Sequence, residues 1–498
     1  MNYLQTHLIL YPVFLPLIGA FVAILVRKHY RIQQLWSLGI LALSFSSSIW
    51  IILLVQLGDS AIVYQLGGWD APMGIVFVAD PLAALFVLMV QLVMLAGLLY
   101  ALGSKDDITC YPMFYPLFLT MATSLSGAFL TGDLFTLFVF AELLVISGTV
   151  LTALSDDRYG VEAAYKYFYI SLLASVFLLL AIGSLYISYG TLNLADLANK
   201  IALQGEKLLL LPAIAFLLAS FMIKSAVFPF HFWQPDFHTA SPTPVSAMLS
   251  SIVVKLGVYG FLRMTTLLFV EQAEVIRIIL LIAGIAGILY GGLSAIGTHN
   301  VKRMLAYSTL AQVGFILVGI GWGTNFSIAA AIVFSFNHSL IKAAMLMLAG
   351  YVASHASKKS AAFTVVTGVG RKLPASGILF FLGAMALSGM PPTSGFLGKL
   401  MLFQGGLTAD RYWSLALIGL SSIFTLIYTF RAFQRIWWQE PGEGIYTKSS
   451  GDQIFAPAIL IVVVLLLGIW ADPLVSLAMH ASDWLANPAS YWAMVLGG

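Results

Sequence analysis

The chain has 498 residues, of which 60% are hydrophobic and 9% are charged, and its formal net charge is +3. A soluble domain carries about 25% charged residues, so this composition excludes a soluble globular protein and favours one that crosses a membrane many times. The single cysteine, Cys110, excludes an intramolecular disulfide and a cysteine-based metal cluster. The sequence shows no phosphate-binding loop, dinucleotide fingerprint, haem or iron–sulfur pattern, so we expect no cofactor, no metal and no nucleic-acid partner.

Long apolar segments follow one another along the whole chain. A membrane-spanning helix needs about 20 apolar residues, and this rule predicts about fourteen spans in an all-α polytopic membrane protein. They centre near residues 15, 45, 90, 121, 144, 178, 217, 256, 287, 313, 340, 388, 425 and 465. The first segment lacks a basic start and a cleavage site, so we interpret it as a span and not as a cleaved signal peptide. The tail 476–498 is predicted to lie at the membrane interface, with Trp484 and Tyr491 as anchors.

Basic residues are distributed unevenly over the loops between these segments. One set of loops holds most of them, including Lys302, Arg303, Arg371 and Lys372, whereas the opposite set holds few, Arg263 among them. Cytoplasmic loops of membrane proteins carry an excess of lysine and arginine. We therefore predict a multi-pass protein of the cell membrane with both termini outside.

Five ionisable residues lie well inside predicted spans rather than at their ends. They are Glu142, Lys224, Lys255, Lys342 and Lys399. Each such residue costs roughly 2.5–3.5 kcal/mol on insertion scales, so five left unpaired would cost on the order of 12–17 kcal/mol. This cost is as large as the whole free energy of unfolding of a typical protein, about 5–15 kcal/mol, so such a fold would not be stable. The five groups must therefore pair, become hydrated or lose their charge.

Glu142 and Lys224 are the most evident pair among them. At 4 Å and an effective dielectric constant of 20, an ion pair contributes about 4 kcal/mol. Lys224 should keep its proton while Glu142 is close and release it when Glu142 moves away or is protonated, because burial disfavours an unpaired charge. This arrangement would be a proton switch. The alternative is a static, structural ion pair.

The stretch from Lys224 to Lys255, KSAVFPFHFWQPDFHTASPTPVSAMLSSIVVK, is predicted to contain an interrupted helix near Pro229. Proline cannot donate a backbone hydrogen bond, and non-helical backbone at membrane depth occurs only where it is buried or lines a wet cavity. A broken helix that carries a charge therefore indicates an ion path, although a proline-rich loop between two ordinary spans is the alternative. Three further residues of this stretch are candidates for proton access: His231, Asp236 and His238.

A second interruption is predicted near Pro391, in ALSGMPPTSGFLGKL, where Lys399 follows the break. Between the two interruptions, FNHSLIKAAMLMLAG carries His338 and Lys342 four residues apart, on one helical face. A single histidine on an apolar face is more often a hydrogen-bonded core residue, but histidine titrates near neutral pH and the neighbouring lysine favours a proton relay.

Four stretches resemble motifs of one family of membrane proteins. PFHFWQPDFHTASPTPVSAML, NVKRMLAYSTLAQVGF, NHSLIKAAMLMLAG and SGMPPTSGFLGKL are similar to the antiporter-like subunits shared by respiratory complex I, membrane-bound hydrogenases and multisubunit Mrp-type cation/proton antiporters. LGGWDAPMGIVFVADPLAAL and TGDLFTLFVFAELLVISG most resemble the D subunits of the Mrp antiporters. The resemblance covers residues 80–440 approximately.

The resemblance implies fourteen helices with two inverted five-helix repeats. The repeats would be 111–268 and 269–438, preceded by three spans in 1–110 and followed by a span and an interfacial tail in 439–498. It also implies a line of charged residues along the membrane midplane, and the matching residues are Glu142, Lys224, Lys255, His338, Lys342 and Lys399. The last position is a glutamate in one of the complex I subunits, so the lysine argues against that one.

By this resemblance the chain is expected to be a transporter subunit and not an enzyme. It would move protons along the midplane residues within a multisubunit Na⁺ or K⁺/proton antiporter, in contact with other membrane subunits and the lipid bilayer. The alternative is a proton-pumping subunit of a complex I-type NADH:quinone oxidoreductase or a membrane-bound hydrogenase. A scaffold without transport is a third possibility, but a scaffold would have apolar residues at the charged positions.

Overall fold

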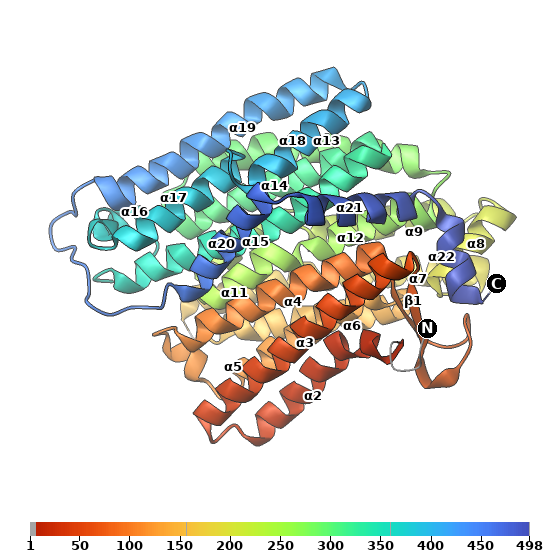
Figure 1. Cartoon of the computed structure of the whole chain (residues 1–498), viewed down its shortest axis with the longest axis horizontal. Coiled ribbons are helices and arrows are strands. Elements are labelled where there is room, and N and C mark those ends of the chain that lie inside the picture. The colour runs from red at the N-terminus through yellow and green to blue at the C-terminus, as the bar shows by residue number, and fades with distance from the viewer. Residues whose placement is uncertain (1–5, 156, 359, 498) are drawn as a thin grey trace.

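A computed structural model describes residues 6–155, 157–358 and 360–497, and the chain forms one bundle of helices (Figure 1). Ten helices of the described chain are long and apolar enough to cross a membrane, and two bent helix pairs raise the number to twelve. Two shorter apolar helices, Phe114–Leu130 and Leu210–Lys224, lie at two further predicted positions. Each of the predicted spans therefore contains a helix, which confirms the all-α polytopic fold.

The N-terminal part of the described chain contains its only strand pair. Its elements are η1 (Leu8–Leu10), α2 (Tyr11–Leu25), α3 (Tyr30–Gly58), β1 (Ile62–Gln65), η2 (Leu66–Gly68), β2 (Val76–Ala79), α4 (Pro81–Leu102) and η3 (Asp107–Cys110). The strands are antiparallel, with Ile62 opposite Ala79. In Figure 1 the chain begins and ends at the same end of the bundle, where this hairpin also lies.

The next part of the chain ends at residue 268. Its elements are α5 (Phe114–Leu130), α6 (Leu134–Ala153), α7 (Arg158–Tyr189), α8 (Leu194–Gln204), α9 (Leu210–Lys224), α10 (Trp233–Ala240), α11 (Thr243–Met248), the π-helical turn η4 (Leu249–Val253), α12 (Lys255–Arg263) and the π-helical turn η5 (Met264–Leu268).

Most of the remaining chain lies in the upper part of Figure 1, and its last helix lies at the right, beside α8. Its elements are α13 (Ala273–Gly297), α14 (Val301–Trp322), α15 (Asn325–His355), α16 (Phe363–Val366), η6 (Val369–Lys372), α17 (Pro374–Ser388), α18 (Ser394–Thr408), α19 (Tyr412–Phe433), η7 (Gln434–Trp438), α20 (Phe455–Ile469), α21 (Asp472–Leu485) and α22 (Pro488–Leu496).

Two helical segments form the centre of the bundle. The apolar windows of Thr243–Leu268 and α15 are fully buried, whereas only 39% of the window is buried in α7 and in α19. The outer helices thus offer apolar faces to lipid, and the two central segments contact only protein. Polar groups on the central segments must find partners inside the molecule, because burying them unpaired is unfavourable.

Both predicted interruptions are present. Helix α9 ends at Lys224, and no helix resumes before Trp233. Helix α17 ends at Ser388, Gly389 adopts a positive φ of 81° that favours glycine, and α18 begins at Ser394. Lys224 is therefore the last helical residue before the break near Pro229. Lys399 lies in the second turn of the helix that follows the break near Pro391.

The tail differs from its prediction. Helices α20 and α21 form a pair bent by 77°, and α21 packs against α15 and α4. Tyr491 on α22 is only 3% exposed, and its ring lies 5.2 Å from the Arg263 guanidinium. The expectation that Tyr491 is an interfacial anchor is therefore wrong, because the chain folds back and the ring covers a buried cation.

Candidate functional site

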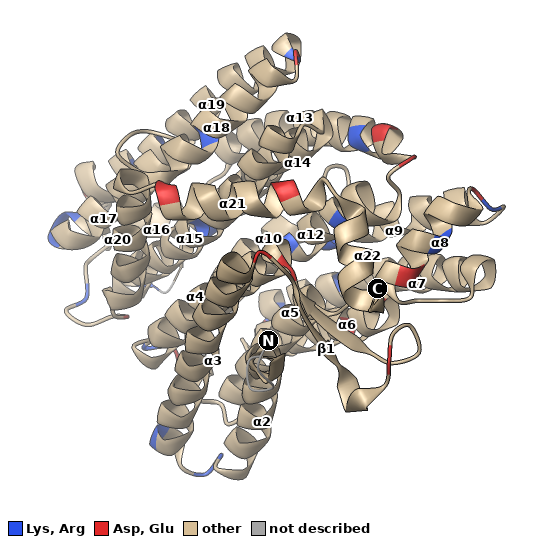
Figure 2. Cartoon of the chain, turned by 45° about the vertical axis from the view of Figure 1, so that its right-hand side comes forward, with Lys and Arg blue, Asp and Glu red and all other residues tan. Residues whose placement is uncertain are grey.

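Charged residues are sparse along the helices and more frequent in the loops and helix ends (Figure 2). The first internal group is the predicted pair of Glu142 on α6 and Lys224 at the end of α9. Lys224 Nζ lies 3.7 Å from Glu142 Oε1, and the two side chains are 5% and 26% exposed. Ser175 of α7 donates a hydrogen bond to the same carboxylate. Lys224 Nζ has no hydrogen-bond partner. The two groups therefore attract each other only through their charges, and the position of the ammonium group is weakly restrained.

The second group lies on the two central segments, where α12 meets α15. Lys255 Nζ is hydrogen-bonded to His338 Nδ1, and both side chains are buried. Ser225, the residue after Lys224, donates a hydrogen bond of 2.8 Å to the carbonyl of Val254, the residue before Lys255. This hydrogen bond joins the segment that follows Lys224 to the segment that precedes Lys255.

Lys342 does not pair with His338, although both lie on one face of α15. Its Nζ donates to the Leu305 carbonyl at 3.1 Å and to Ser308 Oγ at 2.8 Å. Ser308 Oγ lies in turn 2.7 Å from the Tyr428 hydroxyl. His338 and Lys342 were expected to form a relay together, but each contacts a different helix. His338 bonds to Lys255 on α12, whereas Lys342 bonds to α14.

Lys399 on α18 is the third group, and its environment differs from that of Lys224. Its Nζ donates to the Ser388 carbonyl at 2.9 Å and lies 5.2 Å from the centre of the Phe315 ring. Among the described residues, no carboxylate forms an ion pair with it. A carbonyl at the broken helix therefore stabilises the amine without neutralising a charge.

The three proton-access candidates lie in different surroundings. The His231 ring lies 4.6 Å from the Tyr290 ring. Asp236 forms ion pairs with Lys166 at 3.2 Å and Arg303 at 3.0 Å, at the mouth of a cavity, so it holds two helices together at the bundle end. His238 is fully buried, and neither ring nitrogen has a hydrogen-bond partner.

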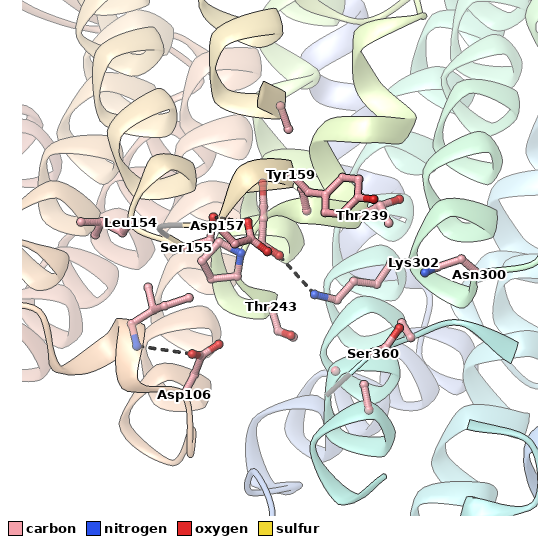
Figure 3. Close-up of a pocket in the computed structure, with 18 of the residues that line it drawn as sticks. Asp106, Leu154, Ser155, Asp157, Tyr159, Thr239, Thr243, Asn300, Lys302 and Ser360 are labelled. Carbon is pink, nitrogen blue, oxygen red and sulfur yellow. Dashed lines mark hydrogen bonds between the residues drawn. The ribbon is translucent and has the colours of Figure 1, made fainter. Parts of the chain in front are cut away.

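A large cavity, with a volume of about 850 Å³, lies at the bundle end that carries the basic loops. Segments far apart in the sequence line it, including those with Asp106, Asp157 and Lys302 (Figure 3). Lys302 Nζ donates to the Ser241 carbonyl at 3.2 Å. His238 does not line the cavity; it is fully buried and directly precedes the lining residue Thr239 in the chain. Sequence reasoning missed this cavity, because no local pattern reveals which loops meet.

Sequence reasoning also assigned Arg263 to a loop, whereas it is buried in α12. Its guanidinium donates two hydrogen bonds, of 2.6 and 2.8 Å, to Asp80, whose carboxylate also caps α4 by accepting from Ala83. The Tyr259 hydroxyl accepts a third at 2.8 Å. The Asp-Pro start of α4 was the one available signal, since aspartate before proline is typical of a helix N-terminus.

Three comparisons bear on what such a chain can be. The family model for the transmembrane region of NADH:quinone oxidoreductases and Mrp antiporters matches residues 131–425. The D subunit of the Na⁺/H⁺ antiporter of Bacillus subtilis (strain 168) is 31% identical over 497 residues, with 99% of this chain and 100% of the relative covered. The N subunit of the NADH-quinone oxidoreductase of Desulforudis audaxviator (strain MP104C) is 34% identical over 419 residues, with 82% of this chain and 83% of the relative covered.

The fold has a close counterpart among solved structures. A chain in the Mrp complex from Dietzia sp. DQ12-45-1b superposes on this one with a TM-score of 0.91 and 26% sequence identity. The superposition covers 100% of both chains. The likeness therefore extends over the bent C-terminal pair and the hairpin as well as over the central helices.

Proposed function

Because the chain belongs to the family of NADH:quinone oxidoreductase and Mrp antiporter membrane subunits, we propose that it is the proton-translocating, D-type subunit of a multisubunit Na⁺ or K⁺/proton antiporter. It is a multi-pass protein of the plasma membrane and part of a larger membrane complex. The observation that carries the proposal is the series of ionisable groups inside the bundle, which runs from the first broken helix to the second. Apolar residues would serve a scaffold better at every one of these positions.

Along this series the proton would pass from Glu142 and Lys224 to Lys255, then to His338 and Lys342, and on to Lys399. The Ser225–Val254 hydrogen bond supports the first step, and the Lys255–His338 hydrogen bond supports the second. A lysine can release its proton when its counter-charge is removed in a dry environment, so each group can exist in two states. The two interrupted helices provide the polar backbone that such paths require.

Protons would enter from the cavity at the end with the basic loops. This cavity is lined by more carboxylates than basic groups, and such a cleft raises the local concentration of cations. His238, the neighbour in the chain of the lining residue Thr239, would connect this cavity to Lys342, because its ring nitrogens have no hydrogen-bond partner and can accept and donate a proton. We retain His231 and Asp236 as secondary candidates. This end would be cytoplasmic, with both termini outside, and 111–268 and 269–438 would be the two repeats.

The proposal is tested by reconstituting the complex that contains this chain in vesicles and measuring the collapse of an imposed pH gradient on addition of Na⁺ or K⁺. Lys399→Ala should reduce the rate to background, and Lys399→Arg should also fail because arginine does not release its proton. Lys200→Ala is the control, since Lys200 pairs with Asp196 on the same helix, α8, outside this series. Wild-type transport by Lys399→Ala in an assembled complex would refute the proposal.

A proton-pumping subunit of a redox complex is the second candidate, and the 34% identity to an oxidoreductase N subunit supports it. In that case the complex would acidify vesicles on quinone reduction, and cations would have no effect. Mass spectrometry of the co-purifying subunits separates the two candidates, because only the redox complex contains cofactor-bearing partners. Cation-driven flux without such partners favours the antiporter.

A further inference from the structure

A small cavity lies beside the second broken helix, between His338 and Lys399. Its volume is about 10 Å³, which is close to the roughly 10–15 Å³ that one water molecule requires. Four polar side chains line it, from α14, α15 and α18, and the rest of its lining is apolar side chains and glycine: the polar ones are Gln312, Asn337, His338 and Lys399. The cavity is thus of the size of a single water molecule, and four of its nine lining residues carry polar side chains.

Three of the four polar side chains have an unpartnered atom and are at most 2% exposed. The atoms are Gln312 Nε2, Asn337 Oδ1 and His338 Nε2. The orientation of Asn337 is determined, because its Nδ2 donates to the Ser394 carbonyl at 2.8 Å and only Oδ1 remains to face elsewhere. Buried polar atoms in proteins are nearly always hydrogen-bonded, so these three indicate a bound molecule.

We propose that this cavity binds one water molecule, held by Gln312 and Asn337, and that this water carries the proton from His338 to Lys399. The inference rests on the proposed proton-translocating function and adds two positioning residues to it. A water needs two donors and two acceptors around it. His338 Nε2–H and the Gln312 amide donate to it, while Asn337 Oδ1 and the neutral amine of Lys399 accept from it.

The protonation of His338 follows from its other neighbour. When Lys255 is an ammonium group it donates to Nδ1, so the hydrogen of the neutral ring resides on Nε2 and faces the cavity. The transfer then balances. Nδ1 gains the proton of Lys255 as Nε2 gives its own to the water, and the water passes one of its protons to Lys399. One charge moves from Lys255 to Lys399, and the ring is left with its hydrogen on Nδ1. Before the next transfer Nδ1 has to release this proton and Nε2 has to take up another one.

The other groups around Lys399 in the described chain cannot supply this proton. The Ser388 carbonyl and the Phe315 ring that contact its amine have no proton to give, and the amide of Gln312 does not release one. Of the polar side chains lining the cavity, His338 alone can donate a proton to the lysine. Gln312 and Asn337 therefore act through the water and do not take part in the transfer themselves.

The test measures proton flux of the reconstituted complex with two substitutions of similar size. Asn337→Leu should lower the flux about tenfold and Gln312→Met about threefold, which are losses of the order that one hydrogen bond produces. Ser335→Ala is the matched control on the same helix, because its hydroxyl bonds only to the Ala331 carbonyl at 2.7 Å. Wild-type flux in both variants, with Lys399→Ala still inactive, would overturn this inference and leave the proposed function intact.

Asn337→Asp adds a readout that a purely structural role would not change, and it decides the matter if Asn337→Leu fails to assemble. A carboxylate next to Lys399 would hold the lysine in its charged form, so the flux should peak at a higher pH than in the wild type. An unchanged pH profile would count against the water site. A cryo-electron microscopy map of the complex should show density for one water between Asn337 and His338, and a direct contact of Lys399 with His338 there would refute it.

Discussion

Two buried ion pairs of the protein have opposite geometries. Arg263 and Asp80 are 6% and 0% exposed and share two short hydrogen bonds, with Tyr259 and Tyr491 on the faces of the guanidinium. Lys224 and Glu142 are 3.7 Å apart without a hydrogen bond between them, and the acid is 26% exposed. The first pair joins α4, α12 and the tail, whereas the second lies at a helix break.

The difference separates a structural charge from one that can change its state. Arginine never releases its proton in proteins, and a bidentate contact allows only one arrangement. Lysine can become neutral, and a single long contact can lengthen further at little cost. We infer that the Arg263–Asp80 pair maintains the fold and that the Lys224–Glu142 pair is the one that responds to protons.

The largest effect should come from the structural pair. Asp80→Asn keeps the cap of α4 but leaves the guanidinium of Arg263 buried without a counter-charge, which should cost roughly 3–5 kcal/mol of unfolding free energy. Denaturant unfolding of the purified protein in detergent measures it, and the transport per folded complex should remain close to wild type. If Asp80→Asn unfolded at the same denaturant concentration as the wild type, the Arg263–Asp80 pair would not be the structural one.

Glu142→Gln should have the reverse profile. Lys224 can lose its proton once the acid is neutral, so folding should change little while transport falls roughly tenfold or more. Glu142→Asp keeps the charge with a shorter reach and should retain partial activity. The rank order of the glutamine, aspartate and wild-type proteins is measured as collapse of a pH gradient in vesicles that lack other antiporters. Equal rates for the glutamine variant and the wild type would make Glu142 a structural group.

A smaller effect is expected from the hydroxyl that supports Glu142. Ser175→Ala removes one hydrogen bond to the carboxylate at a partly exposed site, so transport should fall about two- to threefold. Ser184→Ala on the same helix is the control, because its hydroxyl bonds only to the Leu180 carbonyl. If the two variants transported alike, the carboxylate would not depend on its second contact.

The orientation of the chain can be tested without affecting either pair. In a Cys110→Ser background, a cysteine at Ser360 should not react with an impermeant thiol reagent added to intact cells. A cysteine at Leu208, which is exposed at the opposite end, should react readily. The reverse pattern would place the large cavity outside the cell.

The elements of the fold are readable from the sequence because the bilayer imposes local requirements. Hydrocarbon demands about 20 apolar residues per span and internal hydrogen bonds for the backbone, so hydropathy and proline positions alone indicate the spans and both breaks. The internal charges are equally visible, since Lys224 or Lys399 in an apolar run is expensive at any position. The Glu142–Lys224 pairing was foreseeable because one acid stood among four internal lysines.

The remaining partners are decided only when the helices pack. His338 contacts Lys255 on another helix and not Lys342 on its own, and Arg263 is buried because Asp80 arrives from a segment 183 residues away. Helical periodicity specifies the face on which a side chain lies but contains no information on which helix lies opposite. Distances across helices, and the cavities between them, follow from how all the side chains fill the bundle together, and this is a property of the tertiary structure.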